Sequence, residues 1–197
     1  LTGWTFPFYG VAYSTLFTSA DGYMTMGASV VDFSSSITQM LNGPPRISPF
    51  WADLAQGSGF TRSTLFNAPL GGAAPFLQVE FINVIDWANP AFVHNFSFIV
   101  DSLGTISLSS ALVNQASFYE TMTCVSPGAP FNVGAMLDFS QTVGTPPFSK
   151  AGVLDEQFFE WFGLPSMPAY LPNTTRPYDL TGTTLNFLPI YVEPTGP

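Results

Sequence analysis

Short alternations of apolar and polar residues, separated by turn-forming residues, constrain the fold of this chain more than any other feature. From His94 to Val100 the side chains alternate, so the apolar ones would share one face of a strand. Residues 101–104 (DSLG) then predict a turn into a second alternating stretch, Thr105–Leu108. A final strand is expected over Leu185–Val192, where Pro189 favours the edge of a sheet. The pattern predicts an all-β protein, an antiparallel, jelly-roll-like β-sandwich.

A short helix is the expected exception, near residues 153–162. Apolar residues recur there at helical spacing, acidic residues come early, and Gly163 follows as a C-terminal cap. The whole chain, residues 1–197, fits a single domain with a Pro-rich loop over residues 163–177 and a linker-like tail over residues 193–197.

Charged residues are scarce. They make up 9% of the chain, with 13 acidic and 4 basic residues, whereas an average soluble domain has about 25%. Four scattered cations argue against nucleic acid as a partner and against binding to anionic membranes. No apolar run reaches the ~20 residues of a membrane helix, so no membrane insertion is expected. A surface covered mainly by hydroxyl, amide and apolar groups suits a protein that packs into an assembly, carries sugar or lies in a matrix.

Cys124 and His94 are the only cysteine and the only histidine. One cysteine excludes an intrachain disulfide and a cysteine-based zinc site. Cys124 is therefore either an intersubunit thiol or a small buried hydrophobe, and the second interpretation is favoured. His94 falls on the apolar face of its predicted strand, which favours a packed, hydrogen-bonded histidine of the core or rim over a general base.

Carboxylates offer the best alternative in which the protein is an enzyme. Glu80 and Glu120 could flank a sugar bond, as in a β-jelly-roll glycoside hydrolase, although both also fit solvated strand positions. Asp21, Asp32 and Asp53 do not have the spacing of a calcium loop, and Asp53 is expected to accept backbone hydrogen bonds in a tight loop. We therefore expect no catalytic residue, no metal and no cofactor.

Two sequons make Asn95 and Asn173 candidate glycosylation sites. The aromatic residues also allow a carbohydrate-binding module with glycans as partners. However, phenylalanine dominates with 20 residues against 4 tryptophans, which favours rings in a core or a subunit interface.

Residues 6–54 contain the sequences FPFYG, LFTSADGYMTMG and ISPFWADL. The Asp-Gly pair in the second predicts a two-residue type I′ hairpin turn. These sequences resemble the opening of nidogen-like (NIDO) domains, which implies a β-rich module of extracellular or cell-surface proteins. The residues that carry this fold signature are Asp21, Gly22, Phe50, Trp51 and Asp53.

Together these features predict a non-enzymatic extracellular structural or adhesive protein. It would associate with copies of itself, or with other matrix and surface proteins, through low-charge surfaces and terminal edge strands. The terminal segments Leu1–Tyr9 and Leu185–Val192 are the candidates for exchange between neighbours. A viral capsid or spike subunit is a variant of the same interpretation. Because the chain starts with Leu1 rather than Met, we interpret it as processed, with a secretion signal removed.

Overall fold

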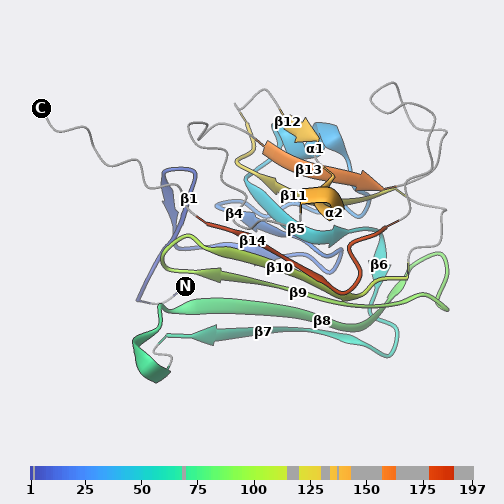
Figure 1. Cartoon of the computed structure of the whole chain (residues 1–197), viewed down its shortest axis with the longest axis horizontal. Helices are drawn as coiled ribbons and strands as arrows, with labels where there is room; N and C mark the ends of the chain where they lie inside the picture. Colours follow the sequence, from blue (N-terminus) through green and yellow to red (C-terminus); the bar gives the residue numbers. More distant parts are fainter. Residues whose placement is uncertain are drawn as a thin grey trace, which may run out of the picture.

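The computed structural model describes residue 1 and residues 3–67, 70–114, 120–129, 134–136, 138–142, 157–162 and 178–188. Within these ranges the long strands form two six-stranded sheets. The sheets lie against each other as two layers (Figure 1). The all-β sandwich predicted from the sequence is therefore confirmed.

The first sheet has the strand order β14-β10-β9-β8-β6, and β7 pairs with β8 beyond the end of β6. Its strands are β6 (Leu54–Ala55), β7 (Phe60–Phe66), β8 (Phe76–Asp86), β9 (Val93–Asp101), β10 (Ile106–Leu112) and β14 (Thr183–Phe187). β9 and β10 follow the predicted hairpin, and β14 lies at the sheet edge as its sequence indicated.

The second sheet has the order β12-β13-β11-β5-β4-β3, and its pairs are antiparallel except for β12 with β13. Its strands are β3 (Leu16–Thr18), β4 (Met24–Met26), β5 (Arg46–Trp51), β11 (Thr121–Ser126), β12 (Gly134–Met136) and β13 (Gln157–Phe162). The remaining elements are the hairpin β1 (Phe6–Phe8) and β2 (Val11–Tyr13), the helices α1 (Ile37–Asn42) and α2 (Phe139–Thr142), and the 3-10 turn η1 (Leu70–Gly72).

Aromatic rings fill the space between the sheets. Phe50 of β5 packs edge-on against Phe96 of β9, with ring centroids 5.6 Å apart, and Phe96 stacks on Phe81 of β8 at 4.4 Å. All three rings are at most 3% exposed. The first and last described strands contribute to this same core, through Phe6 of β1 and Phe187 of β14.

The helix expected near residues 153–162 is not formed over residues 157–162, the part of this segment that the structure describes. Gln157–Phe162 is strand β13, which pairs with β11 on one side and β12 on the other. Phe162 points into the core between the sheets, whereas Phe159 and Trp161 pack on the opposite face of their sheet. A strand buried on both faces gives a continuous apolar run without alternation, and such a run imitates helical spacing.

Residues 163–177 and 193–197, the expected loop and tail, lie outside the described residues. In the part of the chain that the structure describes, no helix is long and apolar enough to cross a membrane.

Candidate functional site

The two most specific sequences of the opening segment lie against each other. The carboxylate of Asp21 accepts a hydrogen bond from the backbone N–H of Leu54 at 3.3 Å, and its backbone carbonyl accepts one from Ala52 at 3.2 Å. A Cβ added to Gly22 would lie 1.9 Å from the carbonyl oxygen of Phe50. Only glycine allows this approach, so the signature residues are explained by the contact between the β3–β4 loop and the end of β5.

The hairpin at Asp21 forms, but with a different turn from the one predicted. β3 and β4 are joined by a five-residue loop, Ser19 to Tyr23, because Thr18 and Met24 are the last paired residues. Gly22 has a φ of 84°, whereas Asp21 is not among the residues of positive φ, so the two-residue type I′ turn is wrong. The side chain of Asp21 faces the start of β6, where it accepts the hydrogen bond from Leu54, and this tertiary contact sets the loop's conformation.

Asp53 does not have the role expected of it. Within the described ranges, the carboxylate that accepts a backbone hydrogen bond in this loop pair is that of Asp21, while Asp53 contributes its backbone carbonyl to Trp87. Burial, with a smaller contribution from the charge of Asp86, raises the pKa of Asp53. Burial also raises the pKa of Asp21, despite its hydrogen bonds.

A β-bulge explains how proline is tolerated in the middle of β5. Ser48 and Trp51 pair with Cys124 and Met122 of β11, so two residues of β5 lie opposite one residue of β11. Pro49 is one of those two residues, and its carbonyl oxygen accepts a hydrogen bond from Thr123 at 2.7 Å. The extra residue turns Phe50 into the core between the sheets and Trp51 to the opposite face.

That opposite face of the second sheet is buried by residues 28–43, here called the covering segment. Val30 and the α1 residues Ile37, Met40 and Leu41 pack on it. The sheet contributes Trp51, Met122, Cys124, Phe159 and Trp161 to this second apolar cluster, and the β3–β4 loop contributes Tyr23. The cluster makes the sheet buried on both sides along β5, β11 and β13.

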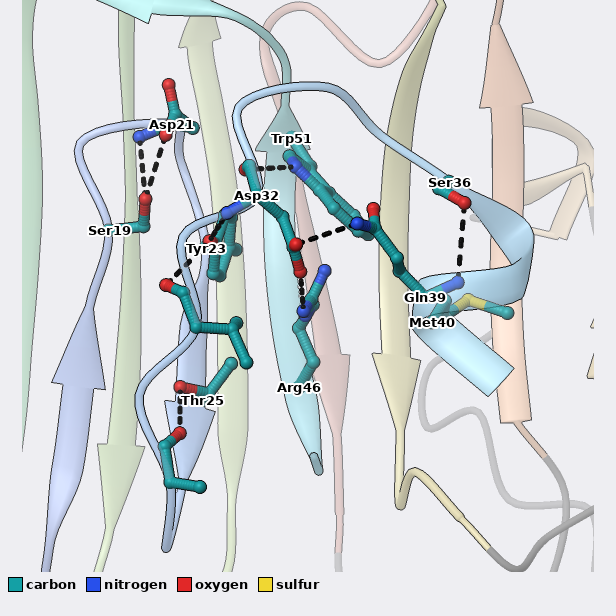
Figure 2. Close-up of polar contacts among 12 residues, drawn as sticks. Ser19, Asp21, Tyr23, Thr25, Asp32, Ser36, Gln39, Met40, Arg46 and Trp51 are labelled. Atoms are coloured by element: carbon teal, nitrogen blue, oxygen red, sulfur yellow. Dashed lines mark hydrogen bonds and ion pairs between the residues drawn. The ribbon is translucent and has the colours of Figure 1, made fainter. Parts of the chain in front are cut away.

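One ion pair holds the covering segment to the sheet (Figure 2). Arg46 of β5 donates from Nη2 to Asp32 Oδ2 at 2.7 Å, and the side chain of Arg46 is 0% exposed. Its guanidinium lies 4.5 Å from the ring centre of Tyr23 and 4.0 Å from that of Trp51. Nε and Nη1 of this buried cation have no hydrogen-bond partner. Among the described residues, Asp32 is the anionic partner of Arg46, and it also accepts a hydrogen bond from Gln39 at 2.7 Å.

Cys124 lies in the second apolar cluster and is 0% exposed. Burial raises its pKa to about 12, against a small opposing contribution from Arg46. The interpretation as an intersubunit thiol stays a prediction; in this conformation the sulfur lies beneath the covering segment. The structure places Cys124 where the favoured interpretation did, as a small buried hydrophobe.

Glu80 and Glu120 are not brought together. Glu80 lies on the outer face of the first sheet, where it accepts a hydrogen bond from Arg62 at 2.8 Å, and Glu120 lies just before β11 in the second sheet. Burial raises the pKa of Glu120. The two carboxylates cannot flank one glycosidic bond in this arrangement.

A different set of carboxylates converges. Asp138, Glu160 and Asp179 each place one oxygen within 4.8 Å of the others. Glu160 is 2% exposed, and its Oε2 accepts a hydrogen bond from the backbone N–H of Phe139 at 2.8 Å. Carboxylate oxygens are the ligands that hard divalent cations prefer, so these three residues could hold one. No sequence pattern indicates this group, because its members come from three separate segments.

His94 lies in the core, on the apolar face of β9 as predicted. It is 0% exposed, and its ring centre is 4.9 Å from that of Phe50. The expected hydrogen bond is not formed, since neither ring nitrogen has a partner. Burial lowers the pKa of His94 to about 4, against an opposing contribution from Asp86.

The glycan-related residues are placed as follows. Asn95 Oδ1 accepts a hydrogen bond from the backbone N–H of Asn83 at 2.9 Å, which gives Asn95 a structural role at the bulge between β8 and β9. Asn173 lies outside the described residues. Of the four tryptophans, all of which are described, Trp51 and Trp161 are at most 4% exposed and Trp87 is 68% exposed. They do not form a row of exposed rings.

Comparison with known families decides the classification. A family model described as NIDO related matches residues 1–101. The chain belongs to the NIDO-related family. This family is extracellular in general and is not a known family of enzymes. No curated protein and no solved structure matches the chain significantly.

Sequence reasoning missed the pair of Asp32 and Arg46. The available signal was an arginine within the otherwise apolar strand sequence RISPFW. A buried charge needs a partner of opposite sign, but two acids within the preceding 25 residues, Asp21 and Asp32, could have supplied it, and the sequence does not choose between them.

Proposed function

We propose that this NIDO-related domain is a non-enzymatic, extracellular structural or adhesive module that associates with copies of itself or with neighbouring surface proteins through low-charge surfaces. The observation that carries this proposal is the character of the exposed surface. Of the two arginines in the described ranges, Arg46 is buried and paired with Asp32, and the exposed Arg62 is paired with Glu80. Large apolar side chains remain open to solvent, among them Phe33 at 62%, Phe60 at 47% and Trp87 at 68%. Such a surface favours association by apolar and hydroxyl contacts rather than by charge.

We also propose that the terminal strands are exchanged between neighbouring copies. Phe6 and Phe187 are 0% and 6% exposed and pack in the core of their own chain. An exchange would therefore transfer these same contacts to a neighbouring copy. Simple removal of either segment would damage the core, so truncation is a poor test of assembly.

The proposal is tested by sedimentation velocity of the wild-type chain over a range of concentrations, at low and high salt. Association driven by low-charge surfaces should increase with concentration and persist or strengthen at high salt, because salt screens ionic contacts but not apolar ones. A monomer at every concentration, together with no binding to extracellular matrix proteins, would contradict the proposal.

A further inference from the structure

Strand β7 forms an open edge of the first sheet. It pairs with β8 over all seven residues, from Phe60 to Phe66, and Figure 1 shows it as the outermost strand of its layer. In the described part of the chain, no strand pairs with its other side. Every second residue of an antiparallel edge strand directs its N–H and C=O away from its neighbour. These outward groups are a template for another strand.

Natural edge strands are usually protected by proline, by charge or by shortness. β7 contains no proline, and its single charge, Arg62, is neutralised by Glu80 at a distance of 2.8 Å. Phe60, Leu65 and Phe66 are 47%, 37% and 36% exposed. The edge therefore lacks the features that prevent pairing between molecules.

We propose that β7 pairs antiparallel with β7 of a second copy, about a two-fold axis at Ser63, and so joins two first sheets into one continuous sheet. This inference rests on the proposed self-association and names its surface. The occupant is a second copy because the strand is complementary to itself.

The register follows from backbone geometry and side-chain identity. In an antiparallel pair, two opposite residues either both direct their N–H and C=O groups toward each other or both direct them away. The two-fold axis must therefore pass between one residue and the same residue of the second copy. With the axis at Ser63, Phe60 lies opposite Phe66 of the second copy, Arg62 lies opposite Thr64, and all seven residues are paired. Aromatic pairs across strands are favourable.

Pairing with the axis at either neighbouring residue is less favourable. An axis at Arg62 would place two arginines directly opposite, which is destabilising. An axis at Thr64 would leave Phe60 without an opposite residue in the second β7. Phe66 already stacks on Phe76 of β8, with ring centroids 4.3 Å apart, so the aromatic contact surface is formed before pairing.

Ser63 provides the test, because its side chain is exposed and its position lies on the proposed axis. Ser63→Lys and Ser63→Glu should each remove the associated species in sedimentation velocity, since identical charges then meet. An equimolar mixture of the two variants should restore association, because lysine then meets glutamate. Ser58→Lys, a matched change at an exposed loop position before β7, should associate as wild type does.

The outcomes separate this inference from the proposed function. If the wild type associates and Ser63→Lys associates equally well, the β7 surface is wrong while self-association stands. Loss of association in Thr184→Lys, on the opposite edge strand β14, would then assign the contact to that edge instead. If the wild type is a monomer throughout, the self-association on which the inference rests is itself refuted.

Discussion

Replacing Asp32 with asparagine should detach the covering segment from the second sheet. The substitution keeps the size of the side chain and removes the anion paired with Arg46, whose side chain is 0% exposed and whose Nε and Nη1 have no hydrogen-bond partner among the described residues. Breaking a buried ion pair by removing one partner costs about 3–5 kcal/mol. Because Asp32 itself is 15% exposed, we expect the lower end, about 3 kcal/mol.

Cys124 reports the opening, since its sulfur is buried beneath the covering segment. Its rate of modification by a thiol reagent measures how often the segment opens when closing is fast. A cost of about 3 kcal/mol raises the open population about 100-fold, because each 1.4 kcal/mol is a factor of ten. We therefore expect Asp32→Asn to be modified about 100-fold faster than wild type at the same pH.

Glu80→Gln is the matched control. It makes the same change in an ion pair of similar length, but the side chains of Arg62 and Glu80 are 55% and 21% exposed. Its cost should be below about 1 kcal/mol, with little change in the modification of Cys124. Arg46→Met combined with Asp32→Asn should recover most of the lost stability, because no unpaired buried charge remains. A modification rate for Asp32→Asn within a few-fold of wild type would refute the reasoning.

Three further predictions concern backbone strain, pH and the sheet bulge. Gly22→Ala should lower the free energy of unfolding by at least about 3 kcal/mol in urea titrations. Gly10 has a similar φ of 78°, but nothing lies within 4 Å of a Cβ added there. Gly10→Ala should therefore cost about 1 kcal/mol. His94 stays neutral in the folded chain down to its pKa of about 4, whereas in the unfolded chain it becomes protonated at about pH 6.5. The free energy of unfolding should therefore fall by about 3 kcal/mol as the pH is lowered from about 6.5 to about 4. His94→Phe should lack that part of the decline; equal pH profiles would count against the buried neutral imidazole. Asn95→Ala should cost about 1 kcal/mol through the lost hydrogen bond to Asn83, and an unchanged urea midpoint would show that the bond adds no stability.

The alternating strands could be predicted from the sequence because each has one face in the core and one toward solvent. β9 shows this best, since every second residue from His94 to Val100 is buried and the residues between them are only partly buried. The prediction failed at β13, where the covering segment buries the second face and removes the alternation. No local pattern could show that residues 28–43 would fold over that sheet.

The same limit applies to the functional residues. The motif around Asp21 and Gly22 could be recognised, but its reason is a contact with β5 and the start of β6, about 30 residues later in the chain. For that reason the carboxylate that accepts a backbone hydrogen bond is that of Asp21, not that of Asp53. The open edge at β7 could not be inferred either, because the seven residues of that strand do not reveal whether it is central or at an edge.

The most direct test of the account is hydrogen exchange at the amides of residues 60–66, compared between dilute and concentrated samples. If copies associate through β7, the outward-facing amides of this strand should gain protection as concentration rises, while the amides already bonded to β8 change little. Association of the wild-type chain without any gain of protection in residues 60–66 would contradict the account.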